Sequence, residues 1–185
     1  MPLTAWLLAT IVELPIGRKR WIGRDMNRIL DAVVGGWSAS TILTFQTGTP
    51  ISLVSGGTLE GGTQRPNVVC PQVSSGLSYH TAAATGASIF SLSCLASPGD
   101  QVAGNAPRYF SNLRSDGVHN MDLSLSKEFT IREGMKLQIR GEFFNFTNTP
   151  RFAIPDTTLS DAQFGQVTST LGSPRQVQFG IRFEF

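Results

Sequence analysis

The sequence predicts an all-β fold of antiparallel, up-and-down strands, and its last ten residues predict it most clearly. In residues 176–185, large apolar residues at odd positions alternate without a break with polar, charged or glycine residues at even positions. Because neighbouring side chains on a strand point to opposite faces, this segment has one apolar and one polar face. Its length matches the roughly 9–11 residues that a tilted strand needs to cross a bilayer core. We therefore expect roughly the last five strands of a transmembrane β-barrel.

Four earlier segments show the same alternation and are expected to be the other strands. They are residues 3–14, 37–47, 120–131 and 135–146, of which the first is the least regular. Lys127 interrupts the apolar face of its strand, and we expect its long side chain to carry the charge to the membrane interface. The charged residues predicted to face the barrel lumen are Asp122, Glu128, Arg140, Glu142 and Arg182.

The connections between these strands alternate in length. Residues 132–134 allow only a tight turn, whereas residues 147–175 and about 50–118 are long, and the latter are rich in Gly, Ser, Thr and Pro. Outer-membrane barrels have short periplasmic turns and long external loops. This alternation of short and long connections predicts that Phe185 lies on the periplasmic side and that both long loops are extracellular.

The connection formed by residues 15–36 does not follow this alternation, because it is long but lies on the predicted periplasmic side. Asp25 is expected to cap a short helix through Val34, which Gly35 and Gly36 would end. The helical spacing is carried by the apolar residues Met26, Ile29, Leu30 and Val33. We expect a structured turn against the barrel rim, and the alternative is a helix on the membrane surface.

Aromatic residues cluster near the predicted strand ends. Trp37, Phe45, Phe129 and Phe143, together with Phe185, suit the aromatic girdles of a membrane barrel. In a soluble protein, the same side chains would pack against a second sheet.

The two cysteines, Cys70 and Cys94, lie in the same long loop. We expect a disulfide between them in an oxidising compartment, which would stabilise the fold by about 3 kcal/mol in the chain-entropy model. The alternative is two unpaired thiols. Two cysteines and two widely spaced histidines do not suggest a structural zinc site.

Composition and motifs argue against several functions. The net charge of +2, without a basic cluster interleaved with aromatics, does not predict nucleic-acid binding. A mean hydropathy of +0.01 is compatible with a barrel, because lipid-facing and lumen-facing residues cancel. His119, Asp122 and nearby serines lack a nucleophile turn or an oxyanion hole, so we expect neither an enzyme nor a cofactor.

The apolar stretch at residues 3–12 lacks the basic n-region and the cleavage site of a signal peptide, which suggests that an exported gene product starts upstream.

The chain resembles the C-terminal barrel segment of TonB-dependent outer-membrane receptors, particularly the acidobacterial-type group that carries a carboxypeptidase-regulatory-like domain. The resemblance covers nearly the whole chain through motifs in a characteristic order. They are ELPIG (13–17), VGGW (34–37), QTGTP (46–50), GNAPR (104–108), NMDLSLSK (120–127), RGEFFNFTN (140–148), FGQVTST (164–170) and PRQVQF (174–179).

The resemblance implies a place in the bacterial outer membrane and a role in nutrient uptake. Such receptors typically have a twenty-two-strand barrel, an N-terminal plug and a segment that contacts the TonB-type energy transducer. Plug and earlier strands are absent here, so this chain alone is expected not to transport anything. Its expected partners are outer-membrane lipid, the remainder of the barrel with its plug, and the transducer through the missing N-terminal part.

The resemblance also implies a second role for the last strand. An alternating strand with a terminal aromatic residue is similar to the signal that the barrel-assembly machinery reads. The residues that would carry this signal are Val177, Phe179, Ile181, Phe183 and Phe185. Two other hypotheses are a secreted β-sandwich adhesion module and a non-functional gene remnant.

Overall fold

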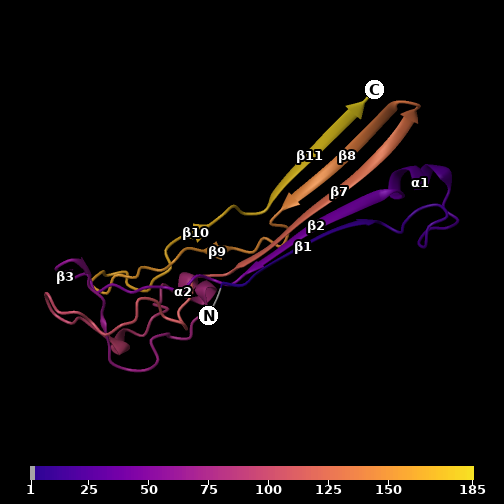
Figure 1. Cartoon of the computed structure of the whole chain (residues 1–185). Helices are drawn as coiled ribbons and strands as arrows, with labels where there is room; N and C mark the ends of the chain where they lie inside the picture. The colour runs from indigo at the N-terminus through magenta and orange to yellow at the C-terminus, as the bar shows by residue number, and fades with distance from the viewer. Residues whose placement is uncertain (1–2) are drawn as a thin grey trace. The chain divides into compact units, whose positions relative to one another are not determined.

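The computed structural model describes residues 3–185, which form two compact units. One comprises residues 5–45, 119–149 and 173–185, and we call it the strand unit. The other comprises residues 3–4, 46–118 and 150–172, and we call it the loop module. Figure 1 shows the long strands of the first and the short elements of the second. In the described residues, 3–185, no helix is both long and apolar enough to span a membrane.

The strand unit is one five-stranded antiparallel sheet. Its strands are β1 (Ala5–Glu13), β2 (Trp37–Gln46), β7 (Val118–Arg132), β8 (Met135–Phe144) and β11 (Gln176–Glu184). They are hydrogen-bonded in the order β1-β2-β7-β8-β11, which is also their order along the chain. The predicted all-β, up-and-down fold with five strands is thereby confirmed.

The register aligns the apolar residues of three strands into rows. Leu123 of β7 pairs with Phe143 of β8, which pairs with Val177 of β11. Four residues earlier in β8, Ile139 pairs with Ile181. Since directly paired residues share a face, one side of the sheet is apolar across β7, β8 and β11.

Gly141 of β8 makes room in this apolar face for an aromatic ring. It pairs with Phe179 of β11, and a Cβ on Gly141 would lie only 3.3 Å from the Phe179 ring. Phe179 nevertheless stays 79% exposed. A β-sandwich would bury these side chains under a second sheet, so the sandwich hypothesis is not supported.

The hairpin between β7 and β8 is the predicted tight turn. The pairing shifts by one residue at Ile131, which forms an irregularity just before the turn. Gly134 then adopts φ +79°, a backbone conformation that glycine adopts without steric cost.

The predicted helix is present but shorter than expected. Helix α1 spans Arg28–Val34, and its N-cap is Asn27 rather than the predicted Asp25. The Asn27 side chain accepts a 2.7 Å hydrogen bond from the Leu30 amide, which places the cap two residues later. The predicted end is correct, since Gly35 caps the helix through the Asp31 carbonyl.

The loop module has its own hydrophobic core. Buried residues from segments far apart in the sequence contribute to it, including Leu53, Phe90, Phe110 and Phe164. Phe90 and Phe164 contact each other with ring centroids 5.3 Å apart. The two long connections therefore fold together into one module, which reasoning from alternation could not detect.

Short elements make up the rest of the loop module. They are β3 (Thr58–Leu59), β4 (Gly62–Thr63), β5 (Asn67–Val68), α2 (Tyr79–Thr85), the 3₁₀ helix η1 (Leu92–Cys94), β6 (Leu95–Ala96), β9 (Arg151–Phe152) and β10 (Thr170–Leu171). The strands pair as β3 with β4, β5 with β6, and β9 with β10.

Candidate functional site

The polar face of the strand unit is the candidate functional surface. Glu142 of β8 pairs with Ser124 of β7 and with Gln178 of β11, so these side chains share one face. Arg140 pairs with Ser126 on the same face. The face therefore places carboxylate, guanidinium, amide and hydroxyl groups side by side across three strands.

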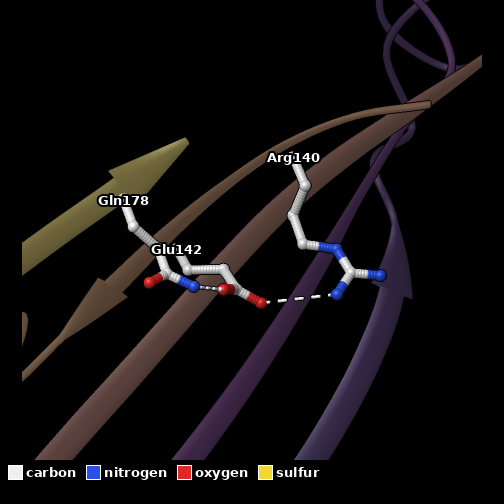
Figure 2. A network of polar contacts seen from close by, with 3 residues as sticks. All are labelled: Arg140, Glu142 and Gln178. Atoms are coloured by element: carbon white, nitrogen blue, oxygen red, sulfur yellow. Dashed lines mark hydrogen bonds and ion pairs between the residues drawn. The ribbon is translucent and has the colours of Figure 1, made fainter. Parts of the chain in front are cut away.

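Glu142 is the centre of a small polar network on this face. Figure 2 shows the Glu142 carboxylate between the Arg140 guanidinium and the Gln178 amide. The Arg140 Nη1 atom lies 3.4 Å from Oε1 of Glu142, and Gln178 donates a hydrogen bond from Nε2 to Oε2. Because Arg140 and Gln178 satisfy both carboxylate oxygens, the network fixes the side chains of β8 and β11 relative to each other.

Ion pairs continue along the same face towards the β7–β8 turn. Glu128 pairs with Lys136 at 2.8 Å, and Arg182 pairs with Glu184 at 2.8 Å. These side chains are about half exposed, or more in the case of Arg182, and such pairs contribute between about 0 and 1 kcal/mol each. Their main effect is to make the face hydrophilic.

A cavity of about 400 Å³ is lined by residues of β1, β2, β7 and β8, and its lining combines polar-face side chains with apolar ones such as Ile11, Ile42 and Phe144. It brings together three of the predicted lumen residues, Asp122, Arg140 and Glu142. A smaller cavity of about 280 Å³ contains Glu128, whereas Arg182 lines neither cavity. These groups can donate and accept hydrogen bonds to a polar solute or to another protein segment.

Serine hydroxyl groups complete this surface. Ser38 and Ser40 of β2 and Ser124 and Ser126 of β7 line the larger cavity. Their even positions in alternating strands predict the polar face for them, although they are not among the residues predicted to act in the lumen.

Asp122 has a structural role at the end of the sheet. Its Oδ1 atom accepts hydrogen bonds from the Asn145 amide at 2.9 Å and from the Asn120 side chain at 3.0 Å. Asn145 has φ +48° and donates from its own side chain to the Ser173 carbonyl. The RGEFFNFTN motif thus contains the asparagine that ties the end of β8 to the segment that enters β11.

Lys127 directs its ammonium group to the end of α1, and the membrane-interface position of its charge stays a prediction. It is 5% exposed, and its Nζ atom donates hydrogen bonds to the carbonyls of Ala32, at 2.6 Å, and of Gly35. The ammonium group also lies 4.9 Å from the centroid of the Phe129 ring. The carbonyl groups at the end of α1 supply the electronegative surroundings that let this lysine be buried.

The predicted girdle aromatics make individual contacts. The Trp37 indole donates to the Val33 carbonyl at 3.0 Å. Phe45 and His119 meet edge to face at 5.8 Å, which directs His119 towards an aromatic ring. The role of the predicted girdle residues in the membrane stays a prediction. Phe143 likewise packs edge to face on Phe146.

The predicted assembly-signal residues occupy one exposed face of β11 and its end. Phe183 and Phe185 stack with their ring centroids 6.1 Å apart. Phe179 lies over Gly141, and Ile181 lies beside Ile139 of β8. Recognition of this strand by the assembly machinery stays a prediction.

The structure contains a disulfide between Cys70 and Cys94, with the Cα atoms 4.9 Å apart. It joins the segment after β5 to the end of η1, next to the β5–β6 pair. Cys94 belongs to the core of the loop module, and Cys70 packs against that core. The bond therefore closes a loop around part of the module's interior.

Two glycines of the motifs lie where no side chain fits. A Cβ on Gly48 would meet the Ser115 carbonyl, and a Cβ on Gly104 would meet the carbonyls of Arg65 and Pro66. Next to Gly104, the Asn105 side chain accepts a 2.6 Å hydrogen bond from the Val68 amide. The QTGTP and GNAPR motifs thus hold the framework of the loop module together.

Tyr79 of the loop module has a strongly perturbed acidity. Its hydroxyl group donates a 2.8 Å hydrogen bond to the Arg114 carbonyl. Burial, and secondarily the negative charge of Asp116, raise the pKa of Tyr79 well above its usual range. Tyr79 therefore acts as a neutral hydrogen-bond donor that anchors α2.

The family of the chain follows from these features and from a sequence comparison. The chain matches the family model described as outer membrane beta barrel domain over residues 4–178, which includes four of the five long strands and the first three residues of β11. Neither a curated protein nor a solved structure matches the chain significantly. An antiparallel sheet with one apolar, exposed face and one polar face matches the lipid-facing and lumen-facing sides of such a barrel. The chain therefore belongs to the outer membrane beta barrel domain family, whose place is the bacterial outer membrane.

Proposed function

We propose that this chain supplies the C-terminal strands of a TonB-dependent outer-membrane receptor that imports a nutrient. The family membership carries the first part of the proposal, since it places the strands in a membrane barrel. The motifs of residues 13–179 support the finer assignment, because they follow the order found in such receptors.

The chain is proposed to act only with the remainder of the barrel. β1 and β11 are the two edges of the sheet, and each leaves backbone donors and acceptors unpaired on its outer side. Unsatisfied backbone groups cost several kcal/mol each in lipid. Earlier strands of the barrel would pair with both edges, and the barrel-assembly machinery would act on β11.

The polar face and the loop module take different parts in this proposal. The polar face, with Arg140 and Glu142, lines the lumen and contacts the plug or the passing solute. The loop module lies outside the cell and makes the first contacts with the ligand. We also propose that the chain is not an enzyme, because the Glu142 carboxylate is held by Arg140 and Gln178 rather than placed beside a nucleophile.

An uptake experiment in the native host tests the proposal. Deleting the locus and deleting the gene of the energy transducer are each expected to abolish growth on the same nutrient. The full-length gene should restore uptake only in cells that contain the transducer, and residues 1–185 alone should not restore it. Uptake that is independent of the transducer, or restoration by residues 1–185 alone, would contradict the proposal.

A further inference from the structure

Residues 18–34, which lie between β1 and β2, expose an unusual group of large apolar side chains. Trp21 is 84% exposed and Ile29 is 81% exposed, and Ile22 and Val33 are exposed beside them. Single exposed apolar residues are common, but a group of this size indicates a surface that something else covers.

The same segment carries a concentrated positive charge. Five of the chain's 15 lysines and arginines lie within residues 18–28, together with one acidic residue, Asp25. Arg20 pairs with Glu13 at 2.9 Å. In the described part of the chain, no carboxylate lies at salt-bridge distance from the remaining cations, Arg18, Lys19, Arg24 and Arg28. The whole chain has a net charge of only +2, so the segment is its most basic region.

Hydrogen bonds hold the basic loop against the helix. The Asp31 side chain accepts a 2.6 Å hydrogen bond from the Arg18 amide, which ties the start of the loop to α1. The Gly17 amide donates to the Ile22 carbonyl at 2.9 Å, which closes the loop that presents Trp21. The charges and the apolar side chains therefore belong to one ordered element.

Two residues fix this element to the sheet. Lys127 donates to the carbonyls of Ala32 and Gly35, and the Trp37 indole donates to the Val33 carbonyl. Lys127 itself pairs with Ile139 of β8, which pairs with Ile181 of β11, so Lys127 lies on the apolar face of the sheet. That face contacts lipid in an outer-membrane barrel. The end of α1 is thus anchored on the lipid side of the sheet.

We propose that residues 18–34 form an interfacial element that binds the headgroups of anionic phospholipids in the adjacent leaflet. Trp21, Ile29 and Val33 would enter the boundary between headgroups and acyl chains, where tryptophan and amphipathic helices partition. Arg24 and Arg28 would contact the phosphates, and each basic residue near an anionic surface favours binding about fivefold. The proposal rests on the barrel described under Proposed function and is continuous with its lipid-facing surface.

Lipid quenching of a single fluorescent label tests this proposal. The full-length gene product carries the Ile29→Cys substitution, is labelled with bimane and is folded into phosphatidylcholine vesicles that contain a minor fraction of phosphatidylglycerol. Bromine atoms are placed on the acyl chains of one lipid or of the other. Quenching per brominated lipid is expected to be several-fold stronger for phosphatidylglycerol, and the double variant Arg24→Gln/Arg28→Gln is expected to lose most of this difference.

Matched controls separate the possible results. Arg108→Gln/Arg151→Gln removes equal charge from the exposed surface of the loop module and should leave the quenching ratio unchanged. A label at Gln138→Cys, on the polar face, should not be quenched. Equal quenching by the two lipids, or no quenching at Ile29→Cys, would overturn the proposal. Heat-modifiable migration of each variant shows whether the barrel has folded, so failure of the barrel is distinguishable from failure of lipid binding.

Discussion

The Nζ atom of Lys127 lies 2.6 Å from the carbonyl oxygen of Ala32, which joins β7 to α1 across 95 residues of sequence. Lys127 sits in the middle of an otherwise apolar row, where a buried charge needs compensation. The carbonyl groups at the end of α1 provide it. Lys127 therefore fixes α1, in the connection between β1 and β2, against strand β7.

Replacing Lys127 with methionine should release α1 from the sheet. Its hydrogen bonds are charge-assisted, so their loss is expected to cost about 2 kcal/mol in the local stability of residues 28–35. Hydrogen exchange of this segment in the folded barrel measures the change. Lys136→Met is the matched control, because Lys136 makes only a half-exposed ion pair with Glu128 and its loss should cost less than about 1 kcal/mol. Equal exchange in the two variants would show that Lys127 does not anchor the helix.

Removing the disulfide should destabilise the loop module. For the double variant Cys70→Ala/Cys94→Ala we expect a loss of about 3 kcal/mol, because the reduced chain regains the entropy of a loop closed across 24 residues. Urea-dependent proteolysis of the full-length protein reports the stability of the module. Ser93→Ala is the neighbouring control, because it leaves the disulfide intact. Ready reaction of both cysteines with maleimide in the unreduced, folded protein would contradict the bond.

Gly104→Ala should also destabilise the loop module, through a steric clash. Its Cβ would overlap the Arg65 carbonyl oxygen, so the backbone has to move at an expected cost of about 1–3 kcal/mol. Gly62→Ala is the control in the same module, because a Cβ there meets nothing within 4 Å and the backbone is not in the left-handed region. The same proteolysis assay should separate the two variants, and indistinguishable curves would contradict the close approach at Gly104.

The loop module should lose stability at alkaline pH through Tyr79. The folded pKa of Tyr79 is raised above the unfolded value of 10.0, so above pH 10 the folded state keeps a proton that the unfolded state releases. Stability due to this group is therefore fully present below pH 10 and is lost as the pH rises beyond it. Denaturant midpoints across this range should fall less steeply for Tyr79→Phe. The exposed Tyr109→Phe serves as the control and should follow the parent curve.

The five strands could be predicted because alternation is a property of each segment alone. Phe179 and Ile181 belong to the alternation of their own strand, which can be read without knowing which strand lies beside it. The register then only aligns the apolar residues of neighbouring strands. The end of α1 was also predictable, since Gly35 and Gly36 are local signals. Asp25 and Asn27 are both favourable caps, however, and sequence preference could not choose between them.

The loop module and the environment of Lys127 could not be predicted in the same way. The contact between Phe90 and Phe164 joins two long connections that show no periodicity of their own. Lys127 looked like a charge near a strand end, because its carbonyl partners lie about a hundred residues earlier in the chain. Such non-local contacts leave no regular spacing in a single sequence.

The most direct test of the central claim is the side of the outer membrane on which each connection lies. One epitope is inserted between Gly61 and Gly62, in the β3–β4 hairpin, and in a second protein one is inserted between Glu133 and Gly134, in the β7–β8 turn. In intact cells that express the full-length gene product, antibody is expected to label the first protein, and the second only after the outer membrane is permeabilised. Labelling of the Glu133–Gly134 insertion in intact cells, with the Gly61–Gly62 insertion protected, would contradict the account.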